Sequence, residues 1–306
     1  MAVTRMNAKL SAVKRIGGCI GKIASFILKS ESAREAFSLS IRRVLSPVSS
    51  SGQVPALLND SALTLWLQRL DGRTVDEVAS AAALARGAWL ADVAKTIPPA
   101  ALLLDAGAGE GQYRHLFSHT QYQSQDFAQY TGTDKGPLQE QWNYGNIDYV
   151  CDITAIPVED GKFDAVLCTE VLEHLPEPIA AIQELSRVLR PGGQLILSAP
   201  LGCGLHQEPH HYYGGFTPWF YRRFFEQAGI DVVEITPLGG LLQHVAQESH
   251  RVGQALKNKF ESSSLEFALG EAMERAIPKM VSSLDDAVFI EQFTVGYVVR
   301  GVKRDR

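Results

Sequence analysis

The spacing of hydrophobic positions changes near residue 101, and this change divides the chain into two kinds of pattern. Residues 61–97 carry apolar positions at helical spacing, and the pair Pro98-Pro99 ends that helix. From 101 onward, short apolar runs alternate with amphipathic segments. Strands are predicted over 101–105, 129–134, 147–151, 163–169, 193–199 and 231–235, with helices over 111–118, 177–189 and 217–228. This alternation predicts an α/β fold with a parallel sheet and right-handed crossovers.

The last part of the chain departs from this alternation. A largely helical stretch is predicted over 238–280, and one long strand is predicted within 287–303. A chain of 306 residues fits one large domain, or one domain with an appendage. We therefore place the main domain at 59–306 and treat 238–280 as a helical insert in it.

Residues 1–58 are predicted to be a basic N-terminal extension that ends in a linker, SPVSSSGQVP at 46–55. Residues 10–29 repeat valine and isoleucine at steps of three and four, which predicts an amphipathic helix. Residues 1–50 carry nine basic residues against two acidic ones, although the whole chain has a net charge of −5. Two interpretations stay open: peripheral contact with an anionic membrane or a targeting role, or a helix that packs on the body or stays partly disordered.

The composition argues against several classes of protein. Hydrophobic residues make up 45% of the chain and charged residues 21%, as in ordinary folded soluble proteins. The sequence has no run of 18 apolar residues, so no helix is predicted to span a bilayer. The net negative charge gives no sign of DNA binding. The four cysteines have no C-x-x-C spacing, which indicates reduced thiols in a cytoplasmic protein.

The glycine-rich turn after the first strand carries the strongest signal for chemistry. Residues 102–111 read LLLDAGAGEG, so an apolar strand runs into a G-x-G-x-G spacing at Gly107, Gly109 and Gly111. Glycines let the main chain turn tightly and let a ligand approach it closely. Dinucleotide-binding enzymes use G-x-G-x-x-G instead, and Gln112 stands where their third glycine would be. An NAD(P)-dependent oxidoreductase is therefore disfavoured.

The turn resembles motif I of the class I S-adenosylmethionine (SAM)-dependent methyltransferases, where an acid precedes the first glycine by two positions, as Asp105 does here. Later stretches similar to that family follow in the same order. They are Asp134 after the second strand, Asp152-Ile153 after the third, FDAVLCTEVLEHL at 163–175, RVLRPGG at 187–193 and HQEPHHYY at 206–213. The last of these resembles the H-x-E-P loop of a bacterial group of methyltransferases. The resemblance covers about residues 75–303.

The resemblance implies a Rossmann-like, seven-stranded, mostly parallel sheet with helices on both faces, in addition to the N-terminal helical extension. It also implies SAM as the cofactor. By this resemblance, Asp134 accepts the ribose hydroxyls, Asp152 accepts the adenine amino group, and Ile153 offers its backbone N–H. The expected cofactor-binding residues are Asp105, Gly107, Gly109, Gly111, Asp134, Asp152, Ile153 and Thr169. An Asp that only caps the next turn is the alternative for Asp152.

Transfer of a methyl group to a hydroxyl requires a place for the hydroxyl's proton. An imidazole with an ordinary pKa near 6.5 suits this task at neutral pH. We expect His206 or His211, on the loop after the fifth strand, to be the general base. The alternative is a loop histidine that only binds backbone groups.

In a second interpretation, a bound metal ion helps the acceptor hydroxyl to lose its proton. The E-x-x-E-H set of Glu170, Glu173 and His174 resembles the metal-binding signature of ubiquinone-pathway and small-RNA O-methyltransferases. An ion there would lower the pKa of the attacking hydroxyl. However, E-V-L-E-H-L also occurs in methyltransferases that use no metal, where these residues order the loop. We favour the loop-ordering role for these three residues, and predict that no metal binds there.

The function favoured is methyl transfer from SAM to an oxygen of a small-molecule, lipid or glycan acceptor. The protein is expected to be cytoplasmic, and residues 10–29 leave peripheral contact with a membrane open. The helical insert is expected either to roof the acceptor pocket or to cover the sheet edge. Its candidate apolar residues are Leu241, Leu242, Val245 and Phe260. Two alternatives remain: a metal-dependent methyltransferase of RNA or a catechol or quinol, and a non-catalytic SAM-binding protein.

Overall fold

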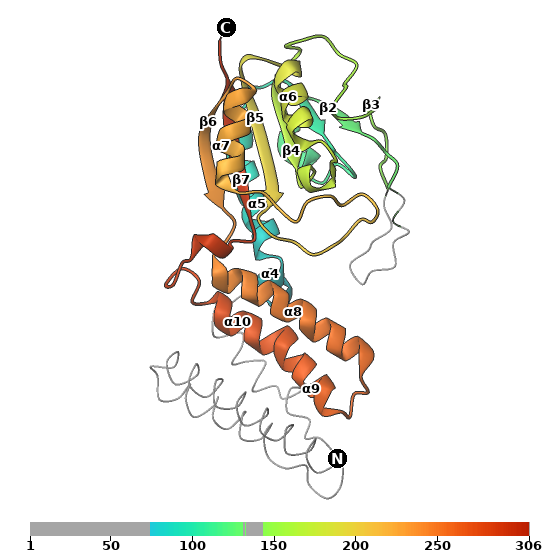
Figure 1. The fold of residues 1–306 in the computed structure, drawn as a ribbon, viewed down its shortest axis with the longest axis vertical. Helices are drawn as coiled ribbons and strands as arrows, with labels where there is room; N and C mark the ends of the chain where they lie inside the picture. Colours follow the sequence, from blue (N-terminus) through green and yellow to red (C-terminus); the bar gives the residue numbers. More distant parts are fainter. Residues whose placement is uncertain (1–73, 131, 133–142, 306) are drawn as a thin grey trace, which may run out of the picture.

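The computed structural model describes residues 74–130, 132 and 143–305. The predicted extension at 1–58 and the predicted ribose ligand Asp134 lie outside the described residues. The described part consists of a sheet covered by helices, with a group of helices from the insert lying beyond one end of the sheet (Figure 1).

The sheet has the architecture that the sequence predicts. Its strands are β1 Leu102–Ala106, β2 Gln121–Asp126, β3 Tyr149–Val150, β4 Phe163–Thr169, β5 Leu189–Pro200, β6 Ile230–Pro237 and β7 Gly296–Lys303. They lie in the order β3-β2-β1-β4-β5-β7-β6. The first five run parallel, and β7 is antiparallel to both β5 and β6. The predicted Rossmann-like, mostly parallel sheet of seven strands is confirmed.

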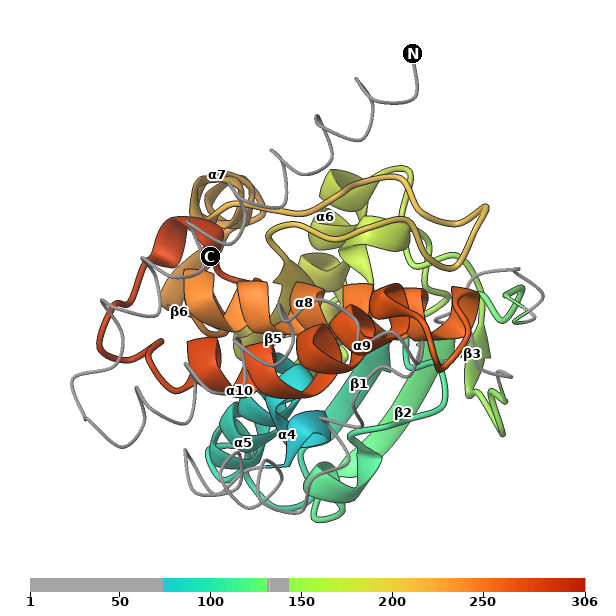
Figure 2. The same cartoon turned by 90° about the horizontal axis from the view of Figure 1, so that it is seen from below.

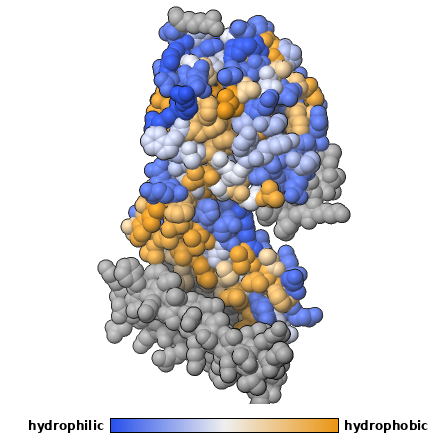
Figure 3. Space-filling model, in the orientation of Figure 1, coloured by the Kyte–Doolittle hydropathy of each residue, from blue (hydrophilic) through white to orange (hydrophobic). Residues whose placement is uncertain are grey.

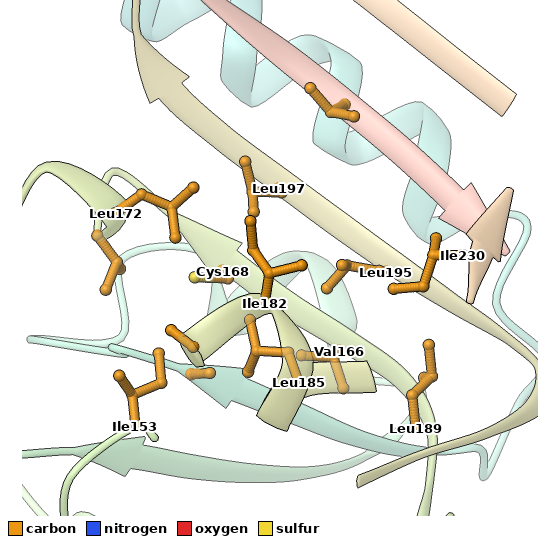
Figure 4. Close-up of a cluster of buried hydrophobic side chains, with 14 of the residues drawn as sticks. Ile153, Val166, Cys168, Leu172, Ile182, Leu185, Leu189, Leu195, Leu197 and Ile230 are labelled. Atoms are coloured by element: carbon orange, nitrogen blue, oxygen red, sulfur yellow. The ribbon is translucent and has the colours of Figure 1, made fainter. Parts of the chain in front are cut away.

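Helices cover both faces because the central strands are apolar on both sides. The covering elements are α5 Ala81–Ala94, α6 Pro178–Val188, α7 Pro218–Gln227, and the short 3-10 helices η1 Arg114–Phe117 and η2 Leu172–His174. The short helix α4 Val75–Ala79 precedes α5 and lies beside the insert helices described below. On one face, Val166 and Leu197 pack against Ile182 of α6 (Figure 4). On the other, Leu167 packs with Leu90 of α5. Such near-continuous burial is typical of parallel strands.

The predicted helical insert is also present. It contains α8 Leu241–Lys259, α9 Leu265–Glu271, a π-helical turn Ala272–Ala276 and α10 Ile277–Ser282, and η4 Glu291–Phe293 follows it. Figures 1 and 2 show these helices beyond the carboxyl end of β5, on the side where parallel strands of such folds place their ligands. The insert is therefore positioned to border a site at that edge.

The surface of the insert is rich in hydrophobic side chains (Figure 3). The exposed residues of this kind include Val245, Val252, Phe260, Leu265 and Leu269, with Val288 and Phe289 after α10. Among the described residues, no helix is both long and apolar enough to cross a bilayer.

The predicted second strand has the wrong residues. The strand beside β1 is Gln121–Asp126, not 129–134. Its sequence, QYQSQD, has no apolar run, because its buried positions are polar and are satisfied by hydrogen bonds. Ser124, for example, donates from both its backbone N–H and its hydroxyl to Asp148 Oδ2, at 2.8 and 2.9 Å. The predicted helix over 111–118 likewise shortens to the 3-10 helix η1.

A buried carboxylate closes the insert on itself, and its removal should destabilise the protein. Asp285 accepts hydrogen bonds from the backbone N–H groups of Gly240 at 2.7 Å, and of Leu242 and Gln243 at 3.0 Å each. These are unpaired donors at the start of α8. We expect Asp285→Ala to lower the free energy of unfolding by about 1.5–3 kcal/mol, the range for hydrogen bonds to charged groups, as measured by urea denaturation. Asp285→Asn keeps an acceptor oxygen and should lose less; equal losses would refute the capping role.

Candidate active site

A cleft of about 1350 Å³ lies at the carboxyl ends of β1, β4 and β5. Its volume exceeds the roughly 300–1,000 Å³ of a site for one small ligand, so it has room for a cofactor and an acceptor together. The predicted site residues that line it are Asp105, Gly107, Gly109, Asp152, Ile153, Thr169 and His206. Gly111 and His211 do not line the cleft, although residues next to them in the sequence do.

The glycine turn has the backbone shape that glycine allows. Gly107, Gly109 and Gly111 have φ of 71°, 53° and 71°, in the left-handed region. At Gly107 a side chain is also excluded by space, because a Cβ atom there would lie 2.4 Å from Val171 Cγ2. Gly107 therefore lets Val171 pack directly against the main chain of the turn.

Asp126, at the end of β2, supports the glycine turn and is the residue that sequence reasoning missed. Its Oδ2 accepts from the Gly109 N–H at 2.9 Å, and its Oδ1 accepts from the Ala128 N–H at 2.9 Å. It lines the cleft. The acid expected at the end of the second strand is therefore Asp126, because the strand lies earlier than predicted. The usual separation of about 20 residues from the glycine turn would have pointed to Asp126 and away from Asp134.

Asp105 lines the cleft and, within the described structure, has one unpaired carboxylate oxygen. The side chain is buried, and the Tyr122 hydroxyl donates to its Oδ2. Its Oδ1 is buried without a hydrogen-bond partner among the described residues. Burial raises the pKa of Asp105 to about 6, against the lowering effect of the Tyr122 hydrogen bond. Such an oxygen is a ready acceptor for a polar ligand group.

Asp152 and Ile153 lie in the cleft at a turn after β3. Asp152 Oδ1 accepts from the Thr154 backbone N–H at 2.9 Å and from the Thr154 hydroxyl at 2.8 Å. This is the turn cap expected as an alternative. The Ile153 side chain belongs to the hydrophobic core. The adenine contacts of both residues stay predictions.

The structure brings His206 and His211 together with a third histidine, His174. The ring centroid of His206 lies 4.7 Å from that of His174 and 4.5 Å from that of His211. One ring nitrogen from each of the three residues lies within 4.8 Å of the others. Burial lowers the pKa of His174 to about 4, although its hydrogen bond to the His210 carbonyl opposes this. His174 is therefore neutral at pH 7.

The two glutamates of the E-x-x-E-H set have different surroundings. Glu170 Oε1 accepts from the Ser198 hydroxyl at 2.7 Å and pairs with Arg86 at 2.9 Å. Glu173 is buried, and its Oε1 lies 3.8 Å from His174 Nε2. Burial and the charge of Glu170 raise the pKa of Glu173 well above its usual range. Within the described residues, the close group of candidate metal ligands is the three histidines, without Glu170.

The helical insert contributes polar residues to the cleft. Gln247, Glu248 and Arg251 of α8 line it, and Glu248 and Arg251 form an ion pair. The predicted apolar roof residues Leu241, Leu242, Val245 and Phe260 are not among the lining residues. The helix α8 therefore borders the cleft through polar side chains, and its role as a roof over the acceptor stays a prediction. The cysteines that are described, Cys151, Cys168 and Cys203, are free thiols.

Comparison with known proteins adds a sequence relationship to this geometry. Residues 104–197 match a family described as "Methyltransferase domain". The chain is 34% identical over 114 residues to a ubiquinone biosynthesis O-methyltransferase of Xanthomonas campestris, which covers 34% of this chain and 45% of that protein. It is 36% identical over 103 residues to a human protein named probable tRNA methyltransferase 9B, which covers 32% of this chain and 21% of that protein.

Solved structures include a phosphoethanolamine N-methyltransferase 2 of Haemonchus contortus, in complex with SAM, at 17% identity and a TM-score of 0.43. That match covers 71% of this chain and 53% of the nematode chain. The chain spans less than half the length of the Xanthomonas relative. The glycine turn, β4 and most of β5 all fall within the range of the family match. The sequence similarity to methyltransferases is therefore found in the part of the chain that carries the glycine turn.

Proposed function

We propose that the chain is a SAM-dependent methyltransferase that acts on an oxygen of a small-molecule, lipid or glycan acceptor. The observation that carries the proposal is the glycine turn that opens onto a cleft at the carboxyl end of β1, inside the range that matches a methyltransferase domain. The name of the Xanthomonas relative supports oxygen as the atom that receives the methyl group.

The residues of the cleft fit this cofactor. Asp105 has a buried oxygen without a partner in the described structure, and Gly107 and Gly109 line the cleft with left-handed backbone. Asp126 takes the ribose role that sequence reasoning gave to Asp134, and Asp152, Ile153 and Thr169 complete the set. Bound SAM supplies a methyl carbon on a sulfonium; its transfer to an acceptor oxygen leaves S-adenosylhomocysteine and releases one proton.

The histidine cluster is the place for that proton. His206 lines the cleft, and His211 lies beside it. We assign both as catalytic residues that act on the acceptor hydroxyl. An imidazole nitrogen with a free lone pair either takes the proton itself or holds a metal ion that lowers the pKa of the hydroxyl.

The test is ligand-dependent stability followed by methyl transfer. SAM at 100 times its Kd is expected to stabilise the folded chain by about 2.7 kcal/mol, whereas NAD should leave the melting temperature unchanged. Stabilisation by NAD alone would refute the proposal.

Transfer from methyl-labelled SAM should then be screened over quinols, lipids, glycans and tRNA. The tRNA arm is included because of the name of the human relative. Strong SAM binding with no labelled product in any arm would favour a non-catalytic SAM-binding protein.

A further inference from the structure

We propose that His174, His206 and His211 bind a divalent transition-metal ion, such as Zn²⁺, Co²⁺ or Fe²⁺, at the acceptor end of the cleft. The catalytic meaning of the ion rests on the proposed function, but its binding does not. The three residues come from two loops: His174 from η2 after β4, and His206 and His211 from the loop after β5.

Two of the imidazoles are held in the tautomer that a metal requires. His174 Nδ1 lies 2.7 Å from the His210 carbonyl oxygen, and His206 Nδ1 lies 2.9 Å from the Gly204 carbonyl oxygen. A carbonyl oxygen only accepts, so each Nδ1 carries the proton. In the neutral form of each ring, the lone pair is then on Nε2. Histidines that ligate metals are oriented in this way by an outer hydrogen bond to a carbonyl.

The third imidazole has an unsatisfied nitrogen. His211 Nδ1 is buried and has no hydrogen-bond partner among the described residues. Its Nε2 lies 3.9 Å from Cys203 Sγ. The Cys203 Sγ also lies 3.4 Å from the Gly214 carbonyl oxygen, to which the thiol donates. An ion would give the unpaired His211 nitrogen a partner.

The loop after β5 is fixed against η2, so the cluster exists before any ion arrives. The backbone N–H groups of Tyr212 and Tyr213 both donate to the Glu173 carbonyl oxygen, at 2.8 and 3.2 Å. The Cys203 N–H donates to the Gly214 carbonyl at 2.8 Å, which closes the base of the loop. The Glu173 carboxyl lies beside His174, and its Oε2 is a second buried atom without a partner in the described structure.

The ligand set indicates both the kind of ion and the kind of acceptor. Imidazole suits zinc, copper, iron and nickel, whereas magnesium prefers oxygen ligands. Three protein ligands leave a position open, as in catalytic zinc sites. Because His174 and His206 line the cleft, the open position can take an oxygen of the acceptor. The substrate class that fits is a hydroxyl compound whose reacting oxygen binds a metal.

The experiment uses the untagged full chain, stripped with a chelator and titrated with Co²⁺. We expect close to one Co²⁺ per chain and the intense visible bands of four-coordinate cobalt. The double variant His206→Ala/His211→Ala should lose both signals. His210→Ala is the matched control from the same loop: it keeps the carbonyl that orients His174, and it should bind Co²⁺ like the unaltered chain.

Affinity is measured by competition with a coloured chelator. Loss of one ligand should weaken binding by at least the roughly 10–100-fold seen for loss of an outer-shell partner. Glu170→Gln should keep the ion. Overturning results are a wild-type affinity no better than that of the double variant, or an ion lost in Glu170→Gln and kept in the double variant. Calorimetry with SAM on the same samples separates failure of the proposed function, which removes SAM binding, from failure of the metal site, which does not.

Discussion

Replacing Gly107 with alanine is expected to weaken SAM binding by roughly 10–100-fold. The new Cβ would lie 2.4 and 2.7 Å from the two methyl groups of Val171, and overpacking of this kind costs about 1–3 kcal/mol. Either the glycine turn or Val171 must move, and both border the cleft. Isothermal titration calorimetry with SAM measures the loss.

Two variants isolate the clash from backbone strain. Gly111 has the same φ of 71°, but a Cβ there meets no atom closer than 3.8 Å. Gly111→Ala therefore tests strain alone and should change the affinity much less. Val171→Ala removes the two methyl groups, so the double variant Gly107→Ala/Val171→Ala should recover most of the binding. Equal losses in the two glycine variants would exclude the close approach of Val171 as the cause.

Removal of the Asp126 carboxylate should have an effect of similar size. Asp126 contacts the glycine turn through the Gly109 N–H, and in our proposal it also accepts hydrogen bonds from the ribose. We expect Asp126→Ala to lower SAM affinity by about 1.5–3 kcal/mol, the range for hydrogen bonds to charged groups, which is roughly 10–150-fold.

Asp134→Ala is the matched comparison for Asp126→Ala, since sequence reasoning assigned the ribose role to Asp134. The assignment rested on the end of the second strand, and that strand ends at Asp126. A small effect of Asp134→Ala beside a large effect of Asp126→Ala is the expected pattern. The reverse pattern would restore the original assignment, and Asp126→Asn shows whether the charge or only the oxygen matters.

The difference between the two acids shows where sequence patterns succeed and where they do not. The strands β1, β4 and β5 were predicted because a central parallel strand is apolar on both faces, as Leu103, Leu104 and Val166 are. The strand β2 was placed too late because its buried residues, Ser124, Gln125 and Asp126, are polar. Hydrogen bonds that the fold itself creates satisfy them, and no hydrophobic period records such bonds.

The site shows the same division. The glycine turn was recognisable because its backbone shape restricts the residue type at each position. The meeting of His174 with His206 and His211 was not, because it depends on how the loop after β5 folds back onto η2. In the insert, helical periodicity predicted α8. The polar side that this helix turns to the cleft, with Gln247 and Arg251, follows only from its position over the sheet.

The carboxylate of Asp285 joins the exit of the insert to its entrance at Gly240. The two ends of the intervening segment, about 44 residues long, thus lie close together. Domains whose termini lie close together can be inserted into other chains. The glycine turn and the histidine loops are encoded elsewhere in the chain. Replacing this segment with a helical unit from another protein should therefore change which acceptor is bound and leave the affinity for SAM unchanged.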